Sequence, residues 1–260
     1  MAESPRVLRF FLLTFAITWG LQVPAVMGQW GWLPGPEALY LLMAALGVLG
    51  PLLAASLLSW QDGGPAALAA LYAPLFRWRV HPGWYVSALL VPGLLLSALL
   101  WALNSAGRTG PVAYLPVGGA VAAGLFISVG EEVGWRGYAL PRLQERWGPF
   151  AASCLLGVVW YLWHIPMLVG HGAPLDLVLV MLLMLVGGSL FFTWIYNGTR
   201  GSLLLAVLAH LGAHLNNSNT ALPDEVVPLV AHAIVYAGLG LLVMRATLPK
   251  TSYRTCVECR

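Results

Sequence analysis

Long apolar stretches with almost no charge constrain the fold of this chain more than any other feature. The stretch 175–196, for example, carries a single charged side chain, Asp176. About 20 consecutive apolar residues are enough for a helix to cross a bilayer. Only 9% of all residues are charged, whereas soluble domains carry about 25%, so a water-soluble fold of this size could not cover its surface. We therefore predict an all-α, polytopic membrane protein.

Eight apolar segments recur along the sequence, and most are near the length of one span. They cover approximately residues 7–27, 38–60, 84–103, 115–140, 149–169, 175–196, 202–217 and 226–246. The seventh is short and ends in polar residues, so we expect it to border a hydrated cavity. We predict about eight transmembrane helices in a single domain, 1–260, that ends in a tail at 247–260.

The distribution of lysine and arginine favours one orientation of eight alternating spans. If the N-terminus is cytoplasmic, eleven of the 13 basic residues fall on the cytoplasmic side. These eleven are Arg6, Arg9, Arg77, Arg79, Arg142, Arg146, Arg200, Arg245, Lys250, Arg254 and Arg260. Arg108 falls in an outside loop, and Arg136 lies within a span. Because cytoplasmic loops are enriched in basic residues, the pattern predicts that both termini, and the tail 247–260, are cytoplasmic.

The charge and cysteine content narrow the range of partners. The formal net charge of +3 is small and dispersed, so we expect no nucleic-acid partner. The lipid bilayer is the expected environment of this multi-pass integral membrane protein, in the plasma membrane if the chain is bacterial. Cys256 and Cys259 form a C-x-x-C pair in the tail, which cannot by itself complete a four-ligand zinc site.

Ionisable side chains inside membrane spans are costly and usually mark function. In this chain they are Glu131, Glu132 and Arg136 in the fourth segment, His164 in the fifth, and His210 and His214 in the seventh. A histidine in a membrane helix can simply hydrogen-bond a neighbouring helix. The clustering of both acids and histidines in three segments favours a functional site instead.

The spacing of these residues predicts that they meet. Glu132 and Arg136 are four residues apart and can pair along one helix face, whereas Glu131 points about 100° away. A turn at Gly148 would form a hairpin in which Glu131, 17 residues before the turn, lies opposite His164, 16 residues after it. Antiparallel helices of equal rise then bring these two residues to the same depth.

A buried carboxylate surrounded by imidazoles suits hydrolysis by an activated water. The carboxylate can take a proton from water. Neutral imidazoles can hydrogen-bond the water and the developing oxyanion, or bind a metal such as zinc. The metal ligands would be Glu131, His164, His210 and His214. A metal-free mechanism uses the same residues, and both mechanisms stay open.

Three motifs in order resemble the CPBP family, the CAAX-protease and bacteriocin-processing intramembrane peptidases. They are Glu131-Glu132-x-x-x-Arg136, then Trp160-x-x-x-His164, and a third motif that begins at His210. The eukaryotic prenyl-protein CAAX endopeptidases belong to this family. The resemblance covers a core of about 115–217, and the connector RWRVHPGWY at 77–85 also resembles the family's segment before its third span.

The resemblance implies a role for each residue of the first two motifs. Glu131 would be the base that activates water, and Glu132 would be a supporting acid paired with Arg136. His164 would share in the activation of the water.

The third motif departs from the family pattern. The resemblance implies that His210 binds a metal or stabilises the oxyanion. His214 stands where the family usually has an asparagine. An asparagine amide can donate a hydrogen bond to an oxyanion, whereas histidine donates only in the right tautomer or when protonated. An additional imidazole also favours a metal site made of glutamate and histidine.

These features favour a CAAX-protease-like intramembrane endopeptidase, of either the glutamate type or the metalloendopeptidase type. We expect it to cleave a peptide or protein substrate near the cytoplasmic membrane face. The resemblance adds lipid-modified proteins as a substrate class. One alternative is a non-catalytic membrane scaffold or immunity protein of the same family. Another is a proton-coupled transporter, although such folds usually carry internal repeats and none stands out here.

Overall fold

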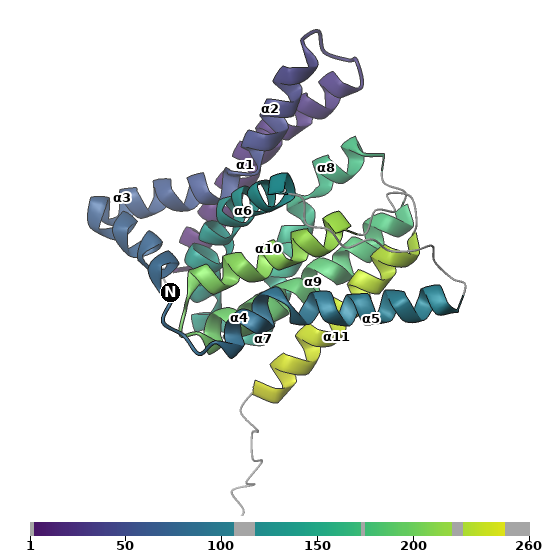
Figure 1. Cartoon of the computed structure of the whole chain (residues 1–260). Coiled ribbons are helices and arrows are strands. Elements are labelled where there is room, and N and C mark those ends of the chain that lie inside the picture. The colour runs from purple at the N-terminus through teal and green to yellow at the C-terminus, as the bar shows by residue number, and fades with distance from the viewer. Residues whose placement is uncertain (1–2, 107–117, 173–174, 220–225, 248–260) are drawn as a thin grey trace, which may run out of the picture.

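The computed structural model describes residues 3–106, 118–172, 175–219 and 226–247. Within these ranges every regular element is a helix (Figure 1), which agrees with the predicted all-α membrane fold. The elements are α1 (Glu3–Gln29), α2 (Glu37–Gly47), α3 (Gly50–Tyr72), η1 (Ala73–Phe76), α4 (Gly83–Leu89), α5 (Val91–Ser105), α6 (Gly118–Glu132), η2 (Val133–Ala139), α7 (Leu140–Trp163), α8 (Ile165–Gly170), α9 (Leu175–Gly198), α10 (Leu203–Asn219) and α11 (Val226–Thr247). Of the predicted tail 247–260, all but Thr247 lies outside the described residues, including Cys256 and Cys259.

Three helical runs are long and apolar enough to cross a membrane, namely Pro5–Gln29, Val121–Gly170 and Leu175–Gly198. Two bent pairs also qualify if each pair is one span: α2 with the run Gly50–Phe76, bent by 51°, and α4 with α5, bent by 45°. The apolar parts of α10 and α11 are shorter. By length and composition, the described residues therefore contain three candidate spans, or five if each bent pair is one span, and the eight spans stay a prediction.

Proline explains why two of the predicted spans are bent. The predicted span 38–60 is broken between α2 and α3, and the span 84–103 is broken between α4 and α5. Pro51 and Pro92 occupy the first turns of α3 and α5. Proline lacks a backbone N–H and clashes with the preceding turn, so it begins a helix more easily than it continues one.

The long run Val121–Gly170 reverses direction at Gly148. The φ angle of Gly148 is +68°, a value that glycine adopts far more readily than other residues. Trp160 donates a hydrogen bond to Glu131, which lies 29 residues earlier, whereas a straight helix would separate the two by roughly 43 Å. The run is therefore a hairpin with the predicted turn, and its two arms are the predicted fourth and fifth segments.

Close backbone contacts join α9 to α7 and α11. A Cβ added to Gly157 of α7 would lie only 2.6 Å from the Cα of Val186 in α9. A Cβ on Gly187 of α9 would collide with the backbone of Ala237 in α11, and one on Gly240 would collide with the carbonyl oxygen of Gly187. Membrane helices associate through such small residues, and these contacts fix the helices that carry the site.

Candidate active site

The two candidate glutamates lie where α6 changes into a π-helical segment. α6 ends at Glu132, and η2 continues the same run of chain. The side chains of Glu131 and Glu132 are buried, with 2% and 0% of their surface exposed. A Cβ on Gly134 would lie 2.5 Å from the Cβ of Pro51, so this glycine allows η2 to pack directly against α3. π-helical turns are rare and frequently occur at functional sites.

Glu132 has two partners on one oxygen. Its Oε1 accepts a 2.8 Å hydrogen bond from the guanidinium of Arg136 and lies 2.8 Å from Nδ1 of His210. Glu132 and Arg136 are both fully buried, and each charge offsets the cost of burying the other. The predicted pairing of these two residues is therefore confirmed, and the bond to His210 ties α10 to α6.

Two aromatic rings enclose the Arg136 guanidinium. Its Cζ lies 5.0 Å from the ring centroid of Trp160 in α7 and 5.0 Å from that of Phe192 in α9. A cation is attracted by the negative face of an aromatic ring. Arg136 therefore connects η2 to both α7 and α9 and holds the Glu132 carboxylate in one place.

Glu131 has a different kind of partner from its neighbour. The indole Nε1 of Trp160 donates a 2.5 Å hydrogen bond to Oε2 of Glu131. The indole N–H is neutral and can only donate. Among the described residues, no basic side chain forms an ion pair with Glu131. Of the two adjacent carboxylates, one is neutralised by an arginine and the other is not.

His164 lies at the junction of α7 and α8. Its Nδ1 is 2.8 Å from the carbonyl oxygen of Trp160. Because a carbonyl oxygen can only accept, Nδ1 carries the proton and Nε2 of the neutral ring carries a lone pair. The ring centroids of His164 and Trp160 are 5.7 Å apart. Trp160 thus bonds Glu131 directly. His164, which was predicted to lie opposite Glu131, follows Trp160 by one helical turn.

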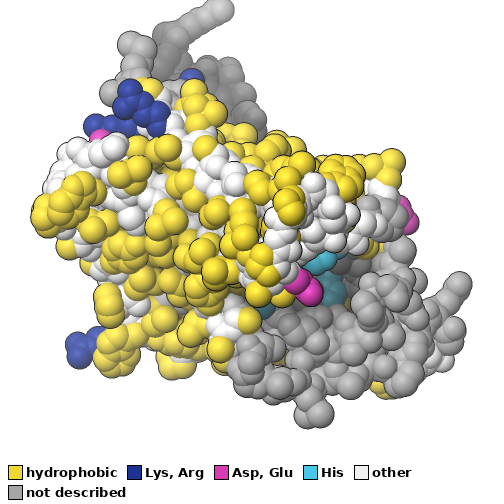
Figure 2. All heavy atoms as spheres, turned by 90° about the horizontal axis from the view of Figure 1, so that it is seen from above, with side chains coloured by type: hydrophobic (Ala, Val, Ile, Leu, Met, Phe, Trp, Pro, Cys, Tyr) yellow, Lys and Arg dark blue, Asp and Glu magenta, His cyan; other side chains and the backbone are white. Residues whose placement is uncertain are grey.

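His210 and His214 stack on one face of α10. Their ring centroids are 4.8 Å apart and their planes differ by 15°. His210 also lies 5.3 Å from the ring of Trp160 and 5.4 Å from that of Phe192. The space-filling view shows a face of the molecule that is mostly apolar and carries few charged side chains (Figure 2).

Trp160 is the residue around which the six predicted side chains gather. It contacts four of them, namely Glu131, Arg136, His164 and His210. The other two side chains contact members of this group: Glu132 is hydrogen-bonded to Arg136, and the ring of His214 stacks on the ring of His210.

Trp160 was not predicted as a direct partner of Glu131, although it is the first residue of the W-x-x-x-H motif. Phe192 was not predicted either, since no pattern distinguishes it from the other apolar residues of its helix.

The described side chains do not fit the predicted metal site. No group of three or more histidine, cysteine or acidic side chains in this part of the chain is arranged to hold a metal ion. The arrangement explains why. Nδ1 of His210 is already bonded to Glu132, and the nearly parallel rings of His210 and His214 direct their in-plane lone pairs along parallel planes instead of toward one ion. The chemistry below therefore uses only the residues of the chain.

The segment that carries this site is similar to known proteins. Residues 112–216, which include all six candidate residues, match the family model described as type II CAAX prenyl endopeptidase Rce1-like. The chain is also 33% identical over 120 residues to CAAX prenyl protease 2 of Methanococcus maripaludis. Both matches support the resemblance of this segment to the CPBP family. The alignment with the Methanococcus maripaludis protein covers 40% of this chain and 44% of that protein.

Proposed function

We propose that this chain is a member of the CPBP family and a membrane-embedded endopeptidase that uses Glu131 to activate a water molecule. The observation that carries the proposal is the difference between two adjacent buried carboxylates. Glu132 is bonded to Arg136 and His210, so its charge is already compensated. Glu131 accepts a hydrogen bond from an indole, so its carboxylate is the one able to act as a base.

The reaction begins with proton transfer from water to Glu131. Trp160 occupies Oε2 of the carboxylate, so Oε1 takes the proton while the water oxygen attacks the carbonyl carbon of the peptide bond. Nε2 of His164, which carries a lone pair, accepts the second hydrogen of the water and orients it. Glu131 then gives its proton to the leaving amine as the C–N bond breaks. The new carboxylic acid gives its remaining proton to the amine, so the products are a carboxylate and an ammonium group.

His210 stabilises the oxyanion of the tetrahedral intermediate. Its Nδ1 is shared with Glu132, so Nε2 is the ring atom left for the substrate. When Nδ1 donates to the ionised carboxylate, Nε2 can donate only if the ring is protonated. A protonated His210 places a positive charge and an N–H group beside the developing negative charge, where both lower its energy.

The substrate is a peptide or protein whose scissile bond lies near the cytoplasmic face of the membrane. The name of the relative from Methanococcus maripaludis, CAAX prenyl protease 2, supports substrates that carry a lipid-modified cysteine. We also propose that the chain crosses the membrane eight times, with both termini in the cytoplasm, because eleven of the 13 basic residues then lie inside.

A cleavage assay on the full-length protein in proteoliposomes tests the proposal. The substrates are fluorogenic peptides with a prenylated cysteine, together with the same peptides without the lipid. The variant Glu131→Gln keeps an oxygen that can accept from Trp160 but cannot take a proton, and we expect kcat to fall by about 10²- to 10⁴-fold. Glu145→Gln changes an exposed acid and is the matched control.

Two results would contradict the proposal. Full activity of the Glu131→Gln variant would remove the residue from the mechanism. No cleavage of any peptide by the wild type, with a cellular phenotype that Glu131→Gln leaves unchanged, would favour the non-catalytic scaffold instead.

A further inference from the structure

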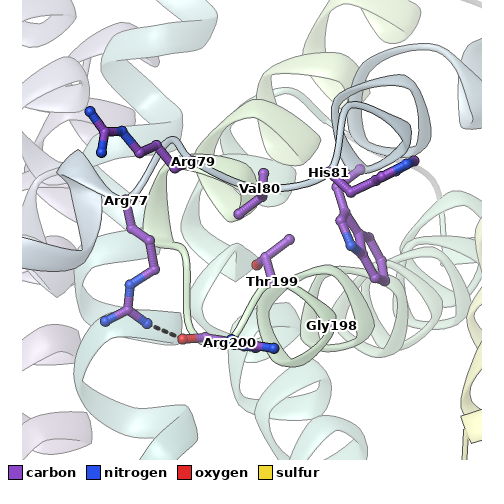
Figure 3. A pocket seen from close by; sticks show the side chains of 8 residues that line it. Arg77, Arg79, Val80, His81, Gly198, Thr199 and Arg200 are labelled. Atoms are coloured by element: carbon purple, nitrogen blue, oxygen red, sulfur yellow. Dashed lines mark hydrogen bonds between the residues drawn. The ribbon is translucent and has the colours of Figure 1, made fainter.

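A basic cavity lies away from the acid and histidine residues of the candidate active site. It has a volume of about 670 Å³ and is lined by Arg77, Arg79, Val80, His81, Trp84, Gly198, Thr199 and Arg200. Figure 3 shows the three arginines around this space, with Arg77 bonded to the backbone of Arg200. No acidic side chain is among the lining residues. The cavity therefore offers an excess of positive charge.

The cavity lies where three candidate spans end. One bent pair ends at Phe76, the other begins at Gly83, and the straight span α9 ends at Gly198. The lining arginines and His81 belong to the two connectors between these helices. Exposed aromatic side chains flank the first connector, with Phe76 78% and Trp78 59% exposed. Aromatic residues of this kind are typical of the boundary between the apolar core of a membrane and its headgroups.

The two connectors are held together by specific contacts. The guanidinium of Arg77 donates to the carbonyl oxygen of Arg200, and the hydroxyl of Ser202 donates to the carbonyl oxygen of Arg77 at 2.7 Å. The φ angle of Arg200 is +56°, the only such value for a residue other than glycine in the described chain. A backbone conformation of this kind is costly for arginine and is often found at functional positions.

The positive charge of the cavity is not compensated by the protein. Among the described residues, no acidic side chain lies within ion-pair distance of Arg77, Arg79 or Arg200. The guanidinium of Arg79 lies 5.1 Å from the ring centroid of Trp78. Arginine presents a planar fork of donors that matches the oxygens of a phosphate. The ligand that completes this site is therefore an anion with several oxygens.

We propose that this cavity binds the phosphate of an anionic phospholipid headgroup. The depth of the cavity, at the ends of three spans, is the depth at which lipid phosphates lie. The connectors also fall on the side of the membrane that the basic residues mark as cytoplasmic, and the cytoplasmic leaflet carries the anionic lipids. Arg79 and Arg200 contact the phosphate oxygens, while Arg77 holds the Arg200 turn in place.

Lipid titration of the detergent-solubilised full-length protein, followed by native mass spectrometry, tests the site. The lipids are phosphatidylglycerol and phosphatidylcholine with identical acyl chains. We expect phosphatidylglycerol to bind at least about tenfold more tightly, because hydrogen bonds to charged groups are strong. The preference should be lost in the double variant Arg79→Gln/Arg200→Gln. Arg146→Gln, which removes an exposed arginine outside the cavity, should keep it.

Two competition experiments distinguish a lipid phosphate from a soluble anion or a peptide carboxylate. Inorganic phosphate should compete only weakly, because it lacks the acyl chains that lie against the helices. Phosphate that binds as tightly as the lipid would identify a soluble-anion site and overturn the proposal. Displacement by a soluble peptide with a free C-terminal carboxylate, but not by its amidated form, would assign the cavity to a peptide and also overturn it.

The wild type alone provides a second measurement in case the double variant does not fold. The preference for phosphatidylglycerol should decline in about 1 M salt, where charges on a surface are strongly screened. Equal binding of the two lipids by the wild type, or a preference that persists in the double variant, would contradict the assignment.

Discussion

Glu131 and Glu132 are adjacent in the chain but have different partners across the helix interfaces. The pairing of Glu132 with Arg136 depends on residues four positions apart, so the sequence predicted it. The bond from Trp160 to Glu131 joins residues 29 positions apart. It depends on the rotation of one hairpin arm against the other, and tryptophan in an apolar segment is more typical of a membrane anchor. The sequence therefore predicted the acids but not the donor that positions one of them.

The indole of Trp160 is a positioning group that can be tested at the residue level. Trp160→Phe removes the N–H donor to Glu131 and keeps an aromatic ring over Arg136. Because a hydrogen bond to a charged group contributes about 1.5–3 kcal/mol, we expect kcat to fall by roughly 10- to 100-fold while KM and Tm change little. Steady-state kinetics and thermal unfolding of the variant provide the check. A fall in Tm with unchanged kcat would mean that the indole is only a packing group.

At the scale of elements, apolar runs predicted the helices well but predicted their ends and bends poorly. Each of the eight predicted segments overlaps a helix or a bent helix pair. The π-helical segment η2 was not predicted, because nothing in its sequence VGWRGYA distinguishes a π-helix from an α-helix. Pro51 lies near the break between α2 and α3 and could have signalled it. The choice between a bend and a new helix depends on tertiary contacts that the sequence does not display.

The contact between α9 and α11 allows a matched test of helix packing. A methyl group added in Gly187→Ala would collide with the backbone of Ala237, whereas one added in Gly238→Ala would meet no atom within 4 Å. Overpacking costs about 1–3 kcal/mol, so we expect a lower Tm for Gly187→Ala. Gly238→Ala should leave Tm unchanged or raise it, since alanine favours helix. Equal Tm values in thermal unfolding would show that the two helices do not pack this closely.

In the whole molecule, the candidate active site and the basic cavity lie on different helices. The acid and histidine residues lie on α6, η2, α7 and α10, while the basic cavity lies at the ends of α9 and of two bent pairs. Helix α10 is close to both of them, because it carries His210 and begins at Leu203, three residues after Arg200. His210 is ten residues from Arg200 along the chain, a distance of about 15 Å in a helix. A lipid in the cavity would thus lie near the cytoplasmic membrane face at which we propose that the peptide bond is cleaved.

The proposed orientation can be measured in intact cells with single-cysteine variants. In a background without the three native cysteines, Arg108→Cys should react with an impermeant maleimide from outside. Arg146→Cys should react only after the membrane is opened, because the basic residues mark its loop as cytoplasmic. Labelling in the reverse order, or of both variants from one side, would contradict the eight-span topology.

The different roles of the two glutamates are tested most directly by measuring kcat and Tm together for Glu131→Gln and Glu132→Gln. We predict that Glu131→Gln lowers kcat by about 10²- to 10⁴-fold with Tm near that of the wild type. We predict that Glu132→Gln lowers Tm, since an uncompensated buried arginine costs about 3–5 kcal/mol. A Glu131→Gln variant with wild-type kcat, or two variants that lose Tm equally, would contradict the assignment of Glu131 as the base.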